Sequence, residues 1–294
     1  MKLLIAGGEG QLGQALRSAC HSLASGSLGR ALQAVLPPSI QAVALGHRQL
    51  DIADAAQIRE AFDAAHPEAV INAAAFTDVD RAESESETAY RINALGPALL
   101  AAATAKRGIP LVHISTDYVF DGRKTTPYME DDAPNPLSVY GESKLKGEEA
   151  VADRNPKHYV VRTAWLYHTT GQNFVNTMRG LANRPVVQVA SDQCGSPTYA
   201  PHLAQALLEL LSRGGAYGLY HIAGSGVASR VELVQEVYRA FGISTKIEPV
   251  PSSTFPRPAA RPAYSALGTN RSQAIVLPPW KQGIEAFAKA IQPQ

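Results

Sequence analysis

The chain has 294 residues, of which 45% are hydrophobic, and its 27 Lys and Arg against 26 Asp and Glu give a formal net charge of +1. This composition is typical of a globular protein that buries a large core. Because the basic residues are scattered along the chain, the sequence predicts neither a nucleic-acid partner nor a membrane surface.

The N-terminal segment and the cysteines predict a cytoplasmic protein. Met1 to Ala6 is too short for the apolar part of a secretion signal, and no apolar stretch approaches the roughly 18 residues of a membrane span. Cys20 and Cys194 lie far apart, with no other Cys or His at metal-ligand spacing. We therefore expect neither a disulfide framework nor a zinc site.

Short apolar runs alternate with segments of helical spacing through most of the chain. The expected strands cover residues 2–6, 41–45, 69–75, 111–115, 159–163 and 219–223. Such alternation predicts an α/β protein with a parallel sheet covered on both faces. The expected architecture is a Rossmann-type doubly wound sheet over residues 1–165, followed by a smaller C-terminal substrate-binding region over 166–294. Residues of about 198–224 are expected to return to the first domain.

Four further segments complete this outline. Residues 22–40 are expected to form an extended helix and a surface loop, and residues 230–241 an amphipathic helix. Residues 171–197 look irregular. The proline-rich segment 249–262 cannot continue a helix or a central strand, so we expect an extended arm on the surface.

A glycine-rich turn follows the first expected strand. Gly7, Gly10 and Gly13 form a G-x-x-G-x-x-G pattern, with Gln11 and Leu12 at the start of the expected helix. Glycines at this position permit a tight turn and let the backbone approach a pyrophosphate at the helix N-terminus. The pattern predicts a dinucleotide site, although a purely structural turn is the alternative.

The second expected strand suggests which coenzyme binds. It ends at Gly46-His47-Arg48, without the acidic residue that usually binds the ribose hydroxyls of NAD. Arg48, with His47 as a second candidate, could meet a 2′-phosphate, so the sequence favours NADPH, with NADH as the alternative. Arg48 could equally be a solvated loop residue.

Two later segments extend the predicted coenzyme site. Asp51 and Ile52 are expected near the adenine, whereas Asp54 is expected to cap a helix. The small residues Ala73, Ala74 and Ala75, at the end of the 69–75 strand, leave room for the coenzyme or serve tight packing.

Tyr140 and Lys144 stand four residues apart on an expected helix, which places them on one face. A close ammonium favours the phenolate, so we expect Lys144 to lower the pKa of Tyr140 and make it a usable acid. Residues 112–120 are expected to form a buried strand that ends in hydroxyl groups. A surface Tyr beside a surface Lys is the alternative interpretation of the pair.

With these motifs, nearly the whole chain resembles the extended short-chain dehydrogenase/reductase superfamily, and within it the dTDP-4-dehydrorhamnose reductase family. The resemblance rests on residues 7–13, 72–80, 115–120, 140–144, 162–167, 173–174, 192–198, 261–262 and 277–280. It implies NADPH-dependent reduction of the C4 ketone of a dTDP-linked 6-deoxy-4-ketohexose to dTDP-L-rhamnose.

The resemblance also implies roles for individual residues. Thr116, Tyr140 and Lys144 would be catalytic, with Tyr140 and Lys144 also at the coenzyme, and Asn93 would order the site. The implied substrate-binding residues are Thr77, Val79, Thr116, Asp117, Trp165, Asn173, Phe174 and Arg261. We expect a dTDP-sugar as the partner and a monomer or homodimer.

Two positions depart from the family pattern. Tyr264 stands where the family has Asn, and Ala15 stands where some relatives have a metal-binding Glu, so no metal is predicted. Two other functions remain open. A nucleotide-sugar epimerase or dehydratase shares the glycine turn and the Tyr/Lys pair, and a regulatory subunit of the methionine adenosyltransferase β type shares the fold.

Overall fold

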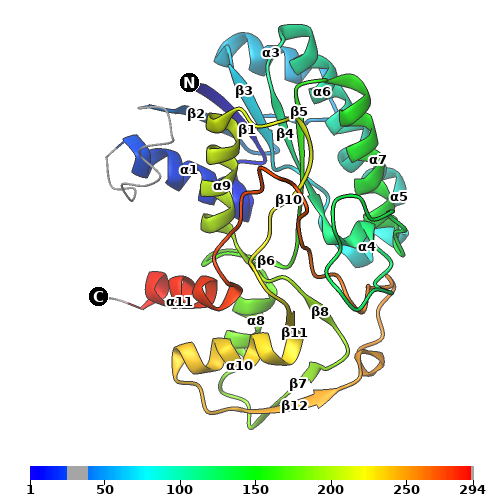
Figure 1. Cartoon of the computed structure of the whole chain (residues 1–294), viewed down its shortest axis with the longest axis vertical. Coiled ribbons are helices and arrows are strands. Elements are labelled where there is room, and N and C mark those ends of the chain that lie inside the picture. Colours follow the sequence, from blue (N-terminus) through cyan, green and yellow to red (C-terminus); the bar gives the residue numbers. More distant parts are fainter. Residues whose placement is uncertain (25–38, 293–294) are drawn as a thin grey trace.

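A six-stranded parallel sheet lies at the centre of the computed structural model, which describes residues 1–24 and 39–292 (Figure 1). From one edge to the other, its strands are β2 (Gln41–Leu45), β1 (Lys2–Ala6), β3 (Ala69–Asn72), β4 (Leu111–Thr116), β5 (His158–Thr163) and β10 (Gly218–His221). All six predicted strands are therefore present. The helix and loop predicted over residues 22–40 lie mostly outside the described residues.

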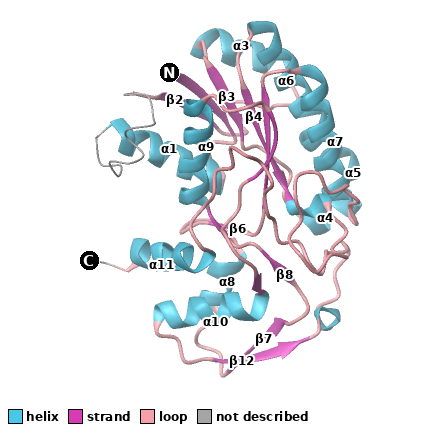
Figure 2. Cartoon of the chain, in the orientation of Figure 1, coloured by secondary structure: helices cyan, strands magenta, loops and turns pink. Residues whose placement is uncertain are grey.

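Helices cover both faces of this sheet (Figure 2). On one face α1 (Gln11–Ala24) packs against α9 (Ala200–Arg213), and on the other lie α3 (Ala55–Ala65), α6 (Gly96–Arg107) and α7 (Val139–Arg154). Each face has its own buried apolar cluster, as expected for strands enclosed on both sides. The predicted doubly wound α/β fold is confirmed.

Two strands end earlier than the predicted segments 69–75 and 112–120, because polar side chains turn the backbone. β3 stops at Asn72, whose side-chain oxygen accepts a hydrogen bond from the Ala74 amide at 3.1 Å, so residues 73–75 form a loop. β4 stops at Thr116, whose hydroxyl accepts from the Tyr118 amide at 3.2 Å and starts a 3₁₀ turn over Asp117–Val119. Both turns lie at the carboxyl edge of the sheet.

The sheet order places a crevice at this edge. β1 connects outward to β2, and the chain then crosses back to β3 on the other side of β1. Ligands of open α/β sheets bind outside the strand ends where the order reverses in this way. Two short helices, α4 (Val79–Ser84) and α5 (Ser86–Tyr90), and a π-helical turn, Arg91–Leu95, follow β3 beside this crevice.

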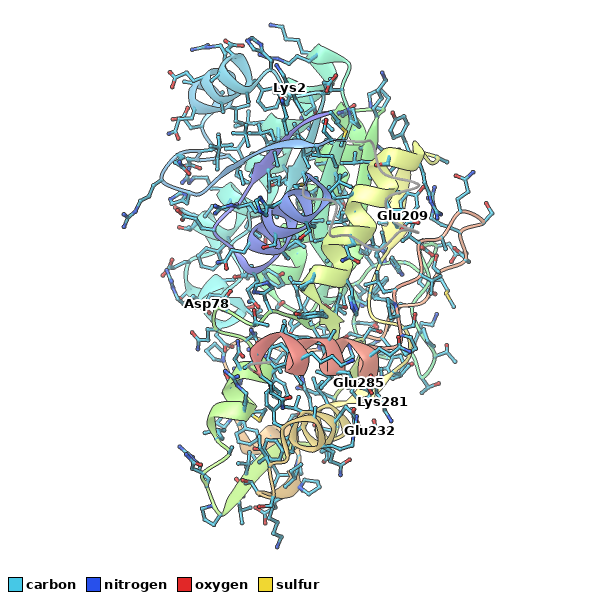
Figure 3. All side chains as sticks on the ribbon, turned by 90° about the vertical axis from the view of Figure 1, so that its left-hand side faces the viewer. Lys2, Asp78, Glu209, Glu232, Lys281 and Glu285 are labelled. Atoms are coloured by element: carbon cyan, nitrogen blue, oxygen red, sulfur yellow. The ribbon has the colours of Figure 1, made fainter. Side chains whose placement is uncertain are left out.

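The second region forms below the sheet in Figure 1. Its helices α8 (Phe174–Gly180), α10 (Arg230–Phe241) and α11 (Trp280–Ile291) share an apolar cluster with the two-stranded sheet of β7 (Val186–Ala190) and β12 (Lys246–Val250). Lys281 of α11 lies beside Glu232 of α10 (Figure 3), and Glu285 of α11 forms an ion pair with Arg239 of α10 at 3.5 Å. The predicted helix over 230–241 is confirmed.

The prediction that residues 171–197 are irregular is wrong. They contain α8, β7 and the short strand β8 (Cys194–Gly195). Asn173 caps α8 by accepting a hydrogen bond from the Asn176 amide at 2.9 Å. β7 forms its hydrogen bonds with β12, a strand much later in the chain, so no local sequence pattern predicts it.

The proline-rich segment also differs in part from its prediction. Pro249 and Val250 belong to β12, which tolerates proline because a two-stranded sheet has only edge strands. Beyond Pro251 the segment has one 3₁₀ turn, Ser252–Thr254, and then runs back to α4, where Arg261 pairs with Asp80. We call residues 251–262 the proline arm.

Short strands connect the two regions. β6 (Leu166–Tyr167) pairs with β9 (Thr198–Tyr199), and β8 pairs with β11 (Ala228–Ser229). Directly after β9 the chain enters α9, and β10 then joins the edge of the central sheet beside β5. No helix in the described part of the chain is long and apolar enough to cross a membrane.

Candidate active site

The glycine turn brings the start of α1 close to two strand ends. Gly7 has φ +80°, and a Cβ there would lie 2.5 Å from the Ala74 nitrogen. A Cβ on Gly13 would collide with the Gly7 carbonyl oxygen. The Gly7 and Gly8 amides donate to Leu45 O at 3.0 and 2.9 Å, which ties the turn to β2. Only glycine fits at the two crowded positions.

A cavity of about 950 Å³ opens at this turn. Eleven of the predicted coenzyme residues line it: Gly7, Gly10, Gln11, Leu12, Asp51, Ile52, Ala73, Ala74, Ala75, Tyr140 and Lys144. Gly13 packs behind the turn instead. Arg48 is exposed and lies outside the lining of this cavity, whereas its neighbours Gly46 and His47 contribute to it.

The donor groups of this cavity fit a dinucleotide. The first amides of α1 have no intrahelical acceptors, so those of Gln11 and Leu12 are available for phosphate oxygens. Burial would raise the pKa of Asp51, but hydrogen bonds from the Ala53 amide and from Arg91, at 2.9 and 2.8 Å, hold it below its ordinary value. Asp51 thus presents an ionised carboxylate on the wall. Asp54 caps α3, as predicted, by accepting from the Ala56 and Gln57 amides.

The three predicted catalytic residues line the same cavity. Thr116 ends β4, and Tyr140 and Lys144 lie in the first turns of α7, which Ser138 caps by accepting from the Gly141 amide at 3.2 Å. Gly141 lets α7 approach the β4 end, because a Cβ there would collide with the Tyr118 carbonyl oxygen. The Tyr118 ring meets the Tyr140 ring edge-on, with centroids 5.6 Å apart.

The electrostatics of the pair differ from the prediction. Lys144 is only 2% exposed, and its ammonium donates to Ile114 O at 2.6 Å. Burial lowers the pKa of Lys144 to about 8, against the opposing effect of Glu148. Burial raises the pKa of Tyr140, while a hydrogen bond with Thr116 acts in the opposite direction. The expectation that Lys144 lowers the pKa of Tyr140 is therefore wrong here, because desolvation of the phenol dominates.

Behind Lys144 lies a buried ionic network that the sequence did not indicate. Glu148 accepts from Arg162 Nη2 at 2.6 Å and from the Ser115 hydroxyl at 2.5 Å. Buried charges are tolerated when they are paired in this way. Because Glu148 follows Lys144 by one helical turn, the network joins α7 to β4 and β5 just below the catalytic groups.

Asn93 orders the neighbouring loop, as the family resemblance implies. Its side-chain oxygen accepts from the Phe76 amide at 2.8 Å, and its nitrogen donates to Phe76 O and to the Ser143 hydroxyl, both at 3.0 Å. The loop that follows β3 is thereby attached to α7.

Most of the predicted substrate residues share the wall of the first cavity. These are Thr77, Val79, Thr116, Asp117, Trp165, Asn173 and Phe174. Arg261 instead lines a second cavity of about 820 Å³, between β7 and the proline arm. The two cavities meet at Phe174 and Arg230, which line both.

Arg230 is a site residue that sequence reasoning missed. Its guanidinium carbon lies 3.5 Å from the ring centre of Trp165 and 4.5 Å from that of Phe174. Burial lowers the pKa of Arg230 to about 10, although Tyr118 and Asp117 act in the opposite direction. The Ser-x-x-Glu pattern at 229–232 marks the start of α10, where a capping box forms, but it does not indicate the stacking.

Two further groups complete the junction. Trp165 has φ +45°, an uncommon conformation for a non-glycine residue, which marks a backbone held by its surroundings. Burial raises the pKa of Asp117 to about 6, against hydrogen bonds from Ser265 and Thr116. The junction between the cavities therefore contains a stacked cation and an enclosed acid.

Tyr264, which departs from the family pattern, lies against the core of the structure. Tyr264 packs against the buried cluster of Val119, Phe120 and Tyr128, so its ring serves the core under the β4 end. In the described part of the chain, no group of three or more His, Cys, Asp or Glu side chains could hold a metal ion. Cys20 and Cys194 are both free thiols.

Comparisons with known proteins agree with this geometry. The model of a family described as the RmlD substrate binding domain matches residues 23–292. A dTDP-4-dehydrorhamnose reductase of Sinorhizobium fredii is 38% identical over 281 residues, which cover 91% of this chain and 95% of the relative.

Solved structures give the same result. A dTDP-4-dehydrorhamnose reductase from Clostridium acetobutylicum superposes with a TM-score of 0.90 at 37% identity, covering 100% of both chains. The enzyme of that name from Bacillus anthracis, solved in complex with NADP, has a TM-score of 0.89 at 34% identity and covers 99% of this chain and 100% of its own.

Proposed function

The chain belongs to the RmlD substrate binding domain family, and from this premise we propose that it is an NADPH-dependent dTDP-4-dehydrorhamnose reductase. It would reduce the C4 ketone of dTDP-4-dehydro-β-L-rhamnose to give dTDP-L-rhamnose, a precursor of cell-surface polysaccharides. The observation that carries the proposal is the convergence of Thr116, Tyr140 and Lys144 on the cavity that begins at the glycine turn.

The coenzyme would occupy the 950 Å³ cavity, with its phosphates at Gly10, Gln11 and Leu12. When bound, a nicotinamide supplies the hydride for ketone reduction. Because burial raises its pKa, Tyr140 keeps its proton at neutral pH and is ready to donate it to the ketone oxygen. Thr116 would hydrogen-bond the same oxygen, and the Lys144 charge would stabilise the negative charge that develops there.

The nucleotide part of the substrate would occupy the 820 Å³ cavity. Arg230, Arg257 and Arg261 supply cations along its wall for a diphosphate. Since the two cavities meet at Phe174 and Arg230, the sugar would lie at this junction, beside Trp165, Thr77 and Val79. The coenzyme preference implied by Arg48, the domain division at residue 165, the cytoplasmic location and the number of copies in the assembly all stay predictions.

The direct test is NADPH oxidation by the purified protein with dTDP-4-dehydro-β-L-rhamnose, in parallel with NADH and with the GDP- and UDP-linked ketosugars. We expect net oxidation that depends on the dTDP-sugar. NAD that copurifies tightly, without net oxidation of added coenzyme, would support the epimerase or dehydratase alternative instead.

Tyr140→Phe tests the assignment of the proton donor. Without the hydroxyl, kcat should fall by about 10²- to 10⁴-fold, the usual contribution of a positioned acid. The Kd for NADPH, measured by fluorescence titration, should stay close to that of the unmodified protein. An undiminished kcat would exclude Tyr140 as the acid.

A further inference from the structure

Asp80 of α4 is the point at which the proline arm attaches to the first domain. Its carboxylate accepts from Arg261 Nη1 at 3.0 Å and Nη2 at 2.9 Å, and from the Ala259 amide at 3.2 Å. Arg257 Nη1 adds a contact at 3.4 Å. The two nitrogens of Arg261 meet both carboxylate oxygens, which is the bidentate geometry of strong, directional ion pairs.

The arm that Asp80 holds forms one wall of the second cavity. Ser252, Ser253, Phe255, Pro256, Arg257, Ala259 and Arg261 all line it. Asp80 itself lines neither cavity. Glu248 is a carboxylate in this wall, where it accepts from Gln188 at 2.8 Å, whereas Asp80 lies behind the wall and fixes the direction of the arginines without facing the ligand.

Arg261 also links the Asp80 contact to the surroundings of Tyr140. The positive charge of Arg261 also acts on the Tyr118 hydroxyl, and the Tyr118 ring meets the Tyr140 ring edge-on. The side chain of Arg261 is 17% exposed, against 55% for Arg257. Since exposed pairs contribute little, the effect of Asp80 should pass mainly through Arg261.

We propose that Asp80 is a positioning residue that presets Arg261, and with it the proline arm, for the diphosphate of the nucleotide-sugar substrate. This inference rests on the function proposed above and adds a residue outside both cavities to the substrate site. An arginine already held by one carboxylate loses less side-chain entropy when a phosphate binds its free edge.

Asp80→Asn tests the proposal, because it removes the charge and keeps the shape of the side chain. We expect the KM for the dTDP-sugar and the Kd for dTDP alone, measured by calorimetry, to rise about 10-fold, the effect of losing one charge-assisted contact. The Kd for NADPH should stay unchanged, and kcat should fall by less than about three-fold. Asp63→Asn is the matched control, since Asp63 forms an ion pair with Arg107 on α3 and α6, away from both cavities.

A double variant separates positioning from general stability. If Asp80 acts through Arg261, then Asp80→Asn should have little further effect on the dTDP Kd once Arg261→Lys is present. Three results would overturn the proposal: an unchanged dTDP Kd in Asp80→Asn, full additivity of the two substitutions, or an equal loss of NADPH binding. Failure of the unmodified protein both to reduce the sugar and to bind dTDP would instead contradict the proposed function.

Discussion

Lys144 is among the largest side chains that are fully buried in the described chain, and it carries a titratable charge at the site. The groups packed around Lys144 determine its pKa more than its sequence spacing from Tyr140 does. The ammonium donates to the Ile114 carbonyl, and the Glu148 charge partly offsets the cost of burial. The charge is therefore held in place by the end of β4 and by the next turn of α7.

The pH dependence of activity should follow this group. With a pKa of about 8, Lys144 is protonated below pH 8 and loses its charge as the pH rises through that value. We therefore expect kcat/KM to fall about tenfold per pH unit above roughly pH 8. A guanidinium has a higher pKa than an ammonium, about 10 even at the buried Arg230, so Lys144→Arg should shift this fall to higher pH by about two units in whatever activity remains. Profiles of kcat/KM from pH 6 to 10 provide the measurement, and the same alkaline limb in both proteins would contradict the assignment.

The sequence predicted which side chains lie at the site better than it predicted their pKa shifts. The spacing of Tyr140 and Lys144 placed both on α7 beside one cavity, as the structure has them. The direction of the Tyr140 pKa shift depends on how enclosed the phenol is, and the elements around it come from separate parts of the chain. Arg230 was missed for the same reason, since its ring partners Trp165 and Phe174 lie far from it in sequence.

Among the elements, the turn between β1 and α1 depends most strictly on its residue types. Gly13→Ala should destabilise the protein and weaken NADPH binding, because the new methyl group would meet the Gly7 carbonyl oxygen. Gly180→Ala, at the end of α8, is the matched control. A Cβ there would meet nothing within 4 Å, so we expect a change of less than about 1 kcal/mol in the free energy of unfolding.

Urea unfolding and NADPH titration of both glycine variants would check this prediction. Equal behaviour of the two would show that the turn can rearrange around a methyl group.

Helices and strands were predicted correctly where a pattern within the segment itself indicates them. The strands of the central sheet are apolar runs, and buried parallel strands have this composition. β7 and β12 escaped prediction because each depends on the other across a long stretch of chain, and Pro249 argued against a strand. The early ends of β3 and β4 depend on hydrogen bonds of the Asn72 and Thr116 side chains. The spacing of apolar residues does not predict such hydrogen bonds.

At the scale of the whole molecule, the second half of the chain completes the core of the first. α9 packs on α1, and Leu203 and Leu207 share an apolar cluster with Leu3, Ile5 and Leu16. A fragment of residues 1–165 lacks α9 and β10, so the part of one sheet face that α9 covers would be exposed. We expect this fragment not to unfold cooperatively in urea, whereas the full chain should show a cooperative transition.

Near-ultraviolet circular dichroism of the fragment and of the full chain makes the comparison. A fragment with native-like aromatic signals and a sharp transition would show that the first domain folds alone.

The stacking of Arg230 on Trp165 has a practical consequence. The chain has two tryptophans, and the other, Trp280, is 6% exposed within the cluster around α10 and α11. In a Trp280→Phe background, the remaining indole would be an intrinsic optical reporter in the wall of the first cavity, in contact with Arg230, which lines both cavities. Its emission would follow ligand arrival in real time by stopped flow, without an attached dye.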